Sequence, residues 1–182
     1  MSSGPSYDPV AQQLQLLLTG YGYNFYSSAN QARADDLLVR ERASYHLAQA
    51  ADMLATMRGE YQRRFIPPLT RENPFPPEEV MAQLREIEAV QQDVSNVETH
   101  IRGMSVPGQD RIWWRIRQEE PLLIQLLHFD LSLVRSSEEV HQYVSLLSPD
   151  QWNSEGSTQL RRLLQQIKLV ARDRERFLLM PA

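Results

Sequence analysis

EEVMAQLREIEAVQQDVSNVETHIRGM, residues 78–104, has the most regular apolar pattern in this chain of 182 residues. Apolar residues recur every seven positions. A second set of apolar residues lies three positions after each of the last three of these. The two sets are Val80, Ile87, Val94 and Ile101, and Val90, Val97 and Met104. Both fall on one face of an α-helix, as in a coiled coil. The pattern covers only three to four heptads, so it predicts either a coiled-coil helix or one helix of an intramolecular bundle.

A longer helix is predicted just before this one, over residues 29–65. Ser28 is placed to cap it, and Pro67 and Pro68 forbid its continuation. Its apolar stripe, in steps of three and four, is Val39, Ala43, Leu47, Ala50, Leu54, Met57, Tyr61 and Phe65. At 1.5 Å per residue this helix is about 55 Å long. We therefore expect it to project beyond its neighbours or to pack along two shorter helices in series.

The connection between these two helices, residues 66–77, is IPPLTRENPFPP, with five prolines among its twelve residues. Proline restricts the backbone to extended conformations, so this segment should be a stiff linker. A linker of this kind can cross the end of a helical bundle.

The chain after this point predicts shorter helices. One helix is expected over residues 110–120. Pro121 then begins a second helix, which is expected over residues 121–135. Ser136 with Glu139 forms a capping-box pattern, which predicts a new helix or a kink over residues 136–147.

The last helix is expected over residues 158–180, after one short turn at 148–151. Its apolar stripe is Leu160, Leu163, Ile167, Val170, Arg174 and Phe177. Six basic and two acidic residues give residues 158–182 a charge of +4 in a chain of −4. The basic face consists of Arg161, Arg162, Lys168, Arg172 and Arg176. Such a face could meet phosphate or an acidic partner. Acids on the helices predicted over residues 29–65 and 78–104 could equally pair with it.

These patterns predict an all-α fold, an antiparallel helical bundle of about four main long helices plus short accessory helices. The length suits a single domain over residues 1–182. Residues 1–27, a short helix followed by an aromatic loop, are expected at its periphery. No stretch has the 18 or so apolar residues of a membrane span, and the first residues lack a secretory signal. A cytoplasmic location follows as an expectation.

Two aromatic clusters are candidate partner-binding sites. The first, in the loop, consists of Tyr21, Tyr23, Phe25 and Tyr26, and we favour a plug over the end of the bundle as its role. The second consists of Trp113 and Trp114 with the neighbouring Arg115 and Arg117. Only one indole can share a helix face with Ile112 and Ile116. The other must point elsewhere, either packed under a loop or available to a protein partner.

Catalytic and metal-binding patterns are sparse. The chain has no cysteine, no Gly-x-Ser-x-Gly elbow and no phosphate-binding glycine loop. A di-iron bundle needs two Glu-x-x-His pairs, and only Glu138 with His141 forms one. The candidate ligands under a metal-binding alternative are Glu138, His141, His128 and His46. The histidines fall on surface or flank positions of their helices, so we predict no cofactor.

The leading interpretation is a non-catalytic intracellular helical bundle that acts through protein–protein contacts, as an adaptor, chaperone-like protein or regulatory subunit. Self-association through the helix of residues 78–104 or the last helix is one form of this interpretation. The alternative is a metal- or cofactor-binding bundle enzyme or carrier. A third interpretation, nucleic-acid binding through the arginine-rich last helix, is disfavoured by the acidic total charge.

Overall fold

The computed structural model describes residues 31–68, 70–71, 74–105 and 110–179. Within these ranges every regular element is a helix, which confirms the all-α prediction. The helices are α2 (Gln31–Phe65), α3 (Glu78–Arg102), α4 (Asp110–Gln118), α5 (Glu120–Leu146) and α6 (Ser154–Leu179). No helix of the described ranges combines the length and apolar content that crossing a membrane requires. The predicted N-terminal helix and aromatic loop lie outside these ranges.

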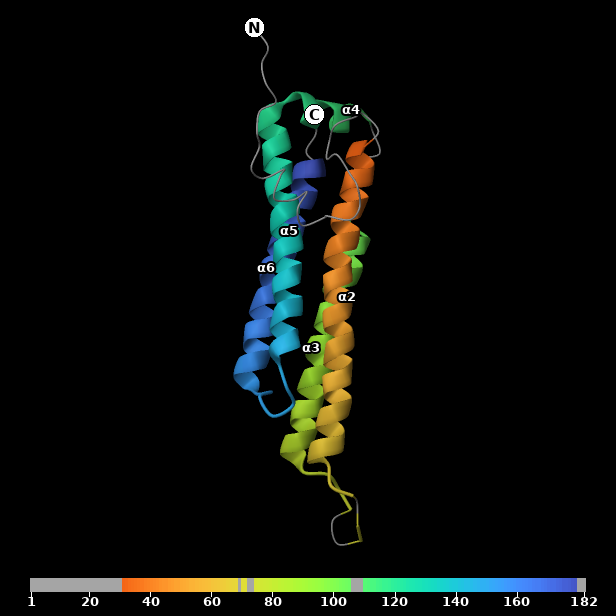
Figure 1. Cartoon of the computed structure of the whole chain (residues 1–182), viewed down its shortest axis with the longest axis vertical. Helices are drawn as coiled ribbons and strands as arrows, with labels where there is room; N and C mark the ends of the chain where they lie inside the picture. The colour runs from red at the N-terminus through yellow and green to blue at the C-terminus, as the bar shows by residue number, and fades with distance from the viewer. Residues whose placement is uncertain (1–30, 69, 72–73, 106–109, 180–182) are drawn as a thin grey trace.

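The four long helices form two antiparallel hairpins that lie side by side (Figure 1). One hairpin is α2 with α3, and the other is α5 with α6. Across the seam, α2 packs on α5 and α3 packs on α6. The turns of both hairpins lie at the same end of the bundle, and the short α4 lies at the other. Helices are therefore antiparallel within each hairpin, as predicted, and parallel across the seam.

The longest helix, α2, projects beyond the second hairpin. It has 35 residues, against 25 to 27 for the other three long helices. Together with the start of α3 it extends past the turn that joins α5 to α6 (Figure 1). This confirms the first of the two expected arrangements. The proline-rich connection reverses the chain at this far tip instead of crossing the bundle, and Phe75 within it is 83% exposed.

The apolar stripes predicted from periodicity form the core. All members of the heptad pattern are buried except Val80, and all members of the α2 stripe are buried except Phe65. The α3 face packs within the same chain, because α3 contacts both α2 and α6. The heptad pattern therefore belongs to an intramolecular bundle, as the second of its two interpretations stated.

Two predicted boundaries in the C-terminal half were wrong. No break occurs at Ser136, because α5 runs unbroken to Leu146. The reason is a stripe of buried residues that passes through this point: Leu133, Ser137, Val140 and Val144. The Ser137 hydroxyl donates a hydrogen bond to the Leu133 carbonyl at 2.9 Å, so this buried polar group has its partner within the helix.

The last helix begins at Ser154, four residues before the predicted start. The side-chain oxygen of Asn153 accepts a hydrogen bond from the Gly156 backbone N–H at 2.8 Å. This is the contact that an N-capping residue makes. Asn153 therefore starts the helix, and Gly156, expected to precede it, lies in its first turn.

Candidate functional site

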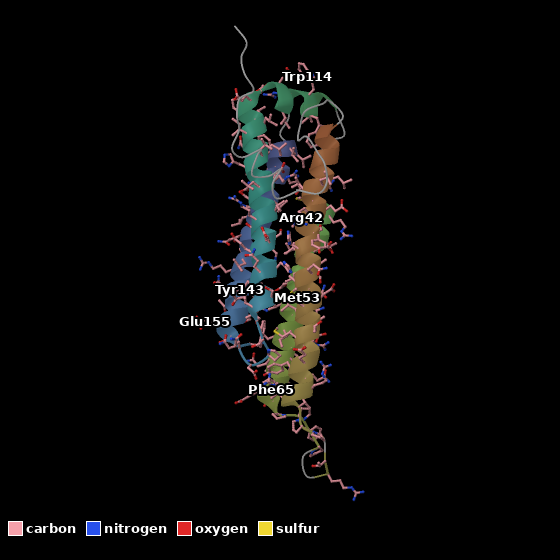
Figure 2. The ribbon with its side chains drawn as sticks, viewed as in Figure 1. Arg42, Met53, Phe65, Trp114, Tyr143 and Glu155 are labelled. Carbon is pink, nitrogen blue, oxygen red and sulfur yellow. The ribbon has the colours of Figure 1, made fainter. Side chains whose placement is uncertain are left out.

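The α4 end of the bundle places two adjacent indoles in opposite environments. Trp113 is 2% exposed and belongs to the core with Ile116, whereas Trp114 is 63% exposed. Successive residues on a helix point about 100° apart, so only one indole can face the core. The prediction that the two would diverge is confirmed, and Trp114 is the exposed one. Figure 2 shows it at the opposite end of the bundle from Phe65.

Backbone hydrogen bonds join α4, the helix that carries Trp114, to α5. The backbone N–H of Glu119 donates to the Arg115 carbonyl at 3.0 Å, and the N–H groups of Leu122 and Leu123 donate to the Glu119 carbonyl at 2.9 and 3.1 Å. These bonds join the end of α4 to the start of α5, although the backbone of Glu119 between the two helices is extended. Trp114 therefore lies on a helix whose end is hydrogen-bonded to the start of α5.

Arg115 is held beside this indole. Its Nε donates to Glu119 Oε1 at 2.7 Å, and both side chains are about half exposed. The side chain of Arg117 and the loop residues Tyr21, Tyr23, Phe25 and Tyr26 lie outside the described part of the structure. The described portion of this end is thus an exposed indole next to an ordered arginine–glutamate pair.

A second feature of the structure is a buried cluster of charged side chains inside the bundle. Arg174 of α6 pairs with Asp36 of α2 at 2.8 Å and donates from Nε to Asp130 of α5 at 2.6 Å. All three side chains are at most 2% exposed. Sequence reasoning placed Arg174 in the apolar stripe of the last helix but found neither acidic partner. One signal was available, since Asp130 interrupts the most apolar run of the chain.

Arg40 extends this buried cluster to α3. Its Nε donates to Asp36 at 3.0 Å, and its Nη1 donates to the backbone carbonyls of Arg102 and Met104 at 3.0 and 3.4 Å. Arg102 is the last residue of α3, where helical carbonyls lack intrahelical partners, and Met104 follows directly after the cap. The cluster therefore joins all four long helices. Because it excludes solvent, it is an architectural element that a substrate could not reach.

The structure brings two of the four candidate metal ligands into contact. His46 of α2 is 6% exposed, and its ring centroid lies 5.6 Å from that of His141 of α5. His46 lies on the flank of its helix, beside the apolar stripe, but α5 covers that flank of α2, so His46 is buried instead of exposed. His128 is exposed and lies thirteen residues before His141 on the same helix, about 20 Å away. The full four-residue set is therefore not assembled.

Burial is the main influence on the pKa of His46. Loss of hydration lowers its pKa, nearby Arg42 lowers it further, and Glu138 partly opposes both effects. The described residues contain no group of three or more His, Asp or Glu side chains arranged to hold a metal ion. Any metal chemistry here would thus depend on the histidine pair.

The basic face of α6 is partly neutralised. Arg161 pairs with Glu86 at 2.5 Å and with Asp93 at 3.4 Å, both on α3, and the hydrogen bond to Glu86 is the main cause of its raised pKa. Arg172 lies 3.5 Å from Asp173. Arg162, Lys168 and Arg176 are exposed. Within the basic face, Arg161 thus pairs with acids on α3, as one of the two expectations stated, while three of the other residues remain exposed.

Comparison of the chain with protein families, with curated proteins and with solved structures finds no match. Its function therefore has to be argued from its own residues.

Proposed function

We propose that this chain is a non-catalytic, intracellular helical-bundle protein that binds a protein partner through the α4 end of the bundle. It would act as an adaptor, a chaperone-like protein or a regulatory subunit. The observation that carries the proposal is Trp114, which is 63% exposed on α4. A large apolar side chain held in water is costly, and it becomes favourable when a partner covers it.

The neighbours of Trp114 support the same conclusion. Tryptophan and arginine are the residue types that most often dominate the energy of protein interfaces, and they do so when rigidly presented. Arg115 provides the arginine, with Glu119 holding it in place. The heptad face of α3 offers no such support for self-association, because its residues are already buried within the chain.

The test is to identify the partner and to locate its contact. The tagged chain would be used to capture proteins from its own cells, alongside Trp114→Ser and the matched control Phe75→Ser. Phe75 is an exposed aromatic residue in the connection between α2 and α3, and this connection lies at the opposite end of the bundle from α4 (Figure 1). A photo-reactive phenylalanine analogue at position 114, and separately at position 75, would show which end touches the captured protein.

The proposal expects one protein to cross-link from position 114 and not from position 75. Trp114→Ser should weaken its binding about 30-fold or more, the effect of losing an interface hot spot of about 2 kcal/mol. Phe75→Ser should bind like the wild type. Equal binding by Trp114→Ser, or no captured protein at all, would refute the proposal. Circular dichroism of both variants would establish that each remains folded.

A further inference from the structure

His46 and His141 form a contact between two imidazole rings where α2 packs on α5. They come from α2 and α5, the two helices that meet across the seam between the hairpins. His46 is 6% exposed, and its Nδ1 has no hydrogen-bond partner among the described residues. A buried polar atom without a partner is uncommon in folded proteins, and an ion bound at that atom is one of its recognised explanations.

The spacing of the rings suits a shared metal ion. An ion bound to one nitrogen of an imidazole lies about 3.2 Å from the ring centroid, the sum of a metal–nitrogen bond of about 2.1 Å and about 1.1 Å within the ring. Two rings with centroids 5.6 Å apart then subtend about 120° at the ion. This is close to the tetrahedral angle of about 109° that zinc prefers.

The surrounding charges also permit a cation. Burial lowers the pKa of His46, which favours the neutral imidazole, the form that binds a metal. The positive charge of Arg42 disfavours a cation at this position, and the negative charge of the Glu138 carboxylate offsets that effect. Glu138 precedes His141 by three residues, so both lie on the same side of α5. His141 is only partly buried, which leaves the pair accessible from solvent.

We propose that His46 and His141 together bind one divalent transition-metal ion of the type that favours imidazole, such as zinc or nickel, between α2 and α5. Water completes its coordination. This site is separate from the α4 end and does not depend on the proposed partner. Because the ion links two helices that are distant in the sequence, it binds the folded chain and not the unfolded one, and it therefore stabilises the fold.

The test is thermal unfolding of the full chain, without a histidine tag, after treatment with a chelator and dialysis. Zinc or nickel at about ten times the dissociation constant should raise Tm by about 3–6 °C. His46→Gln and His141→Gln should each abolish the rise. His100→Gln and His128→Gln, which remove exposed single histidines, should retain it. Magnesium, which prefers oxygen ligands, should produce no rise in any of these proteins.

A direct binding measurement accompanies the melting curves. Calorimetric titration with zinc should give one ion per chain for the wild type and no comparable binding for His141→Gln. That variant alters a partly exposed residue, so it keeps the test decisive if the buried His46→Gln fails to fold. The proposal is overturned if zinc leaves Tm of the wild type unchanged. It is equally overturned if the rise persists in His141→Gln, which would place the ion elsewhere.

Discussion

Replacing Arg174 with methionine removes the centre of the buried ion cluster. Methionine keeps much of the length of the arginine side chain but makes no ion pair. Asp130 then loses the 2.6 Å contact from Arg174, while Asp36 retains Arg40 at 2.8 Å. The variant therefore removes this cationic contact from a carboxylate that is 0% exposed.

The expected cost is large. Removing one partner of a buried ion pair leaves an uncompensated charge and typically costs about 3–5 kcal/mol. This is a substantial part of the total stability of a domain, which is about 5–15 kcal/mol. Salt should not change the loss, because buried charges are poorly screened.

The assay is equilibrium unfolding in urea, followed by circular dichroism, for the wild type, Arg174→Met and the matched control Arg172→Met. Arg172 lies on the same helix, but its side chain is 57% exposed and its ion pair with Asp173 is long. Its loss should change the free energy of unfolding by less than about 0.5 kcal/mol. The double variant Arg174→Met with Asp130→Leu should recover most of the stability, because apolar groups then replace both charges.

A loss of less than about 1 kcal/mol for Arg174→Met, close to that of the control, would refute this reasoning. It would mean that water reaches Asp130 and that the cluster is not closed. A double variant no more stable than Arg174→Met would refute the second part, the claim that the buried charge of Asp130, without Arg174, causes the loss.

Three further variants test other features. Gly59→Ala should stabilise the chain by about 0.5–1 kcal/mol and raise Tm by about 1–4 °C, since an added Cβ would meet only Arg63, at 3.8 Å. Trp113→Ala should cost about 3–5 kcal/mol in urea unfolding, and Trp114→Ala less than about 0.5, as expected for one buried and one exposed indole. Arg161→Ala should cost less than about 1 kcal/mol, and this difference should vanish in 1 M salt because the pair is partly exposed.

Local periodicity was enough to predict the helices and most of the core. The heptad face of residues 78–104 and the stripe of residues 29–65 are buried almost as expected, because a helix repeats its facing residues at fixed intervals. The divergence of Trp113 and Trp114 follows from the same geometry. The wrong break at Ser136 has a different origin. A capping motif is a local signal, and a continuous buried stripe outweighed it.

Contacts across the seam could not be predicted in this way. Arg174 and Asp130 each stood out as a charge in an apolar setting, but nothing local paired them with each other or with Asp36. His46 was misjudged for the same reason, because its burial depends on which flank of α2 is covered by α5. Which two helices lie side by side is a property of the whole chain and not of any one segment.

The side-by-side hairpins also imply an order of folding. Contacts within each hairpin join residues that are near in sequence, whereas the seam joins α2 to α5 and α3 to α6, far apart along the chain. Local contacts form sooner, because closing a long loop costs more entropy. Each hairpin should therefore assemble first, and their docking should complete the native state. The ion cluster then forms late, so Arg174→Met should accelerate unfolding and leave the folding rate nearly unchanged.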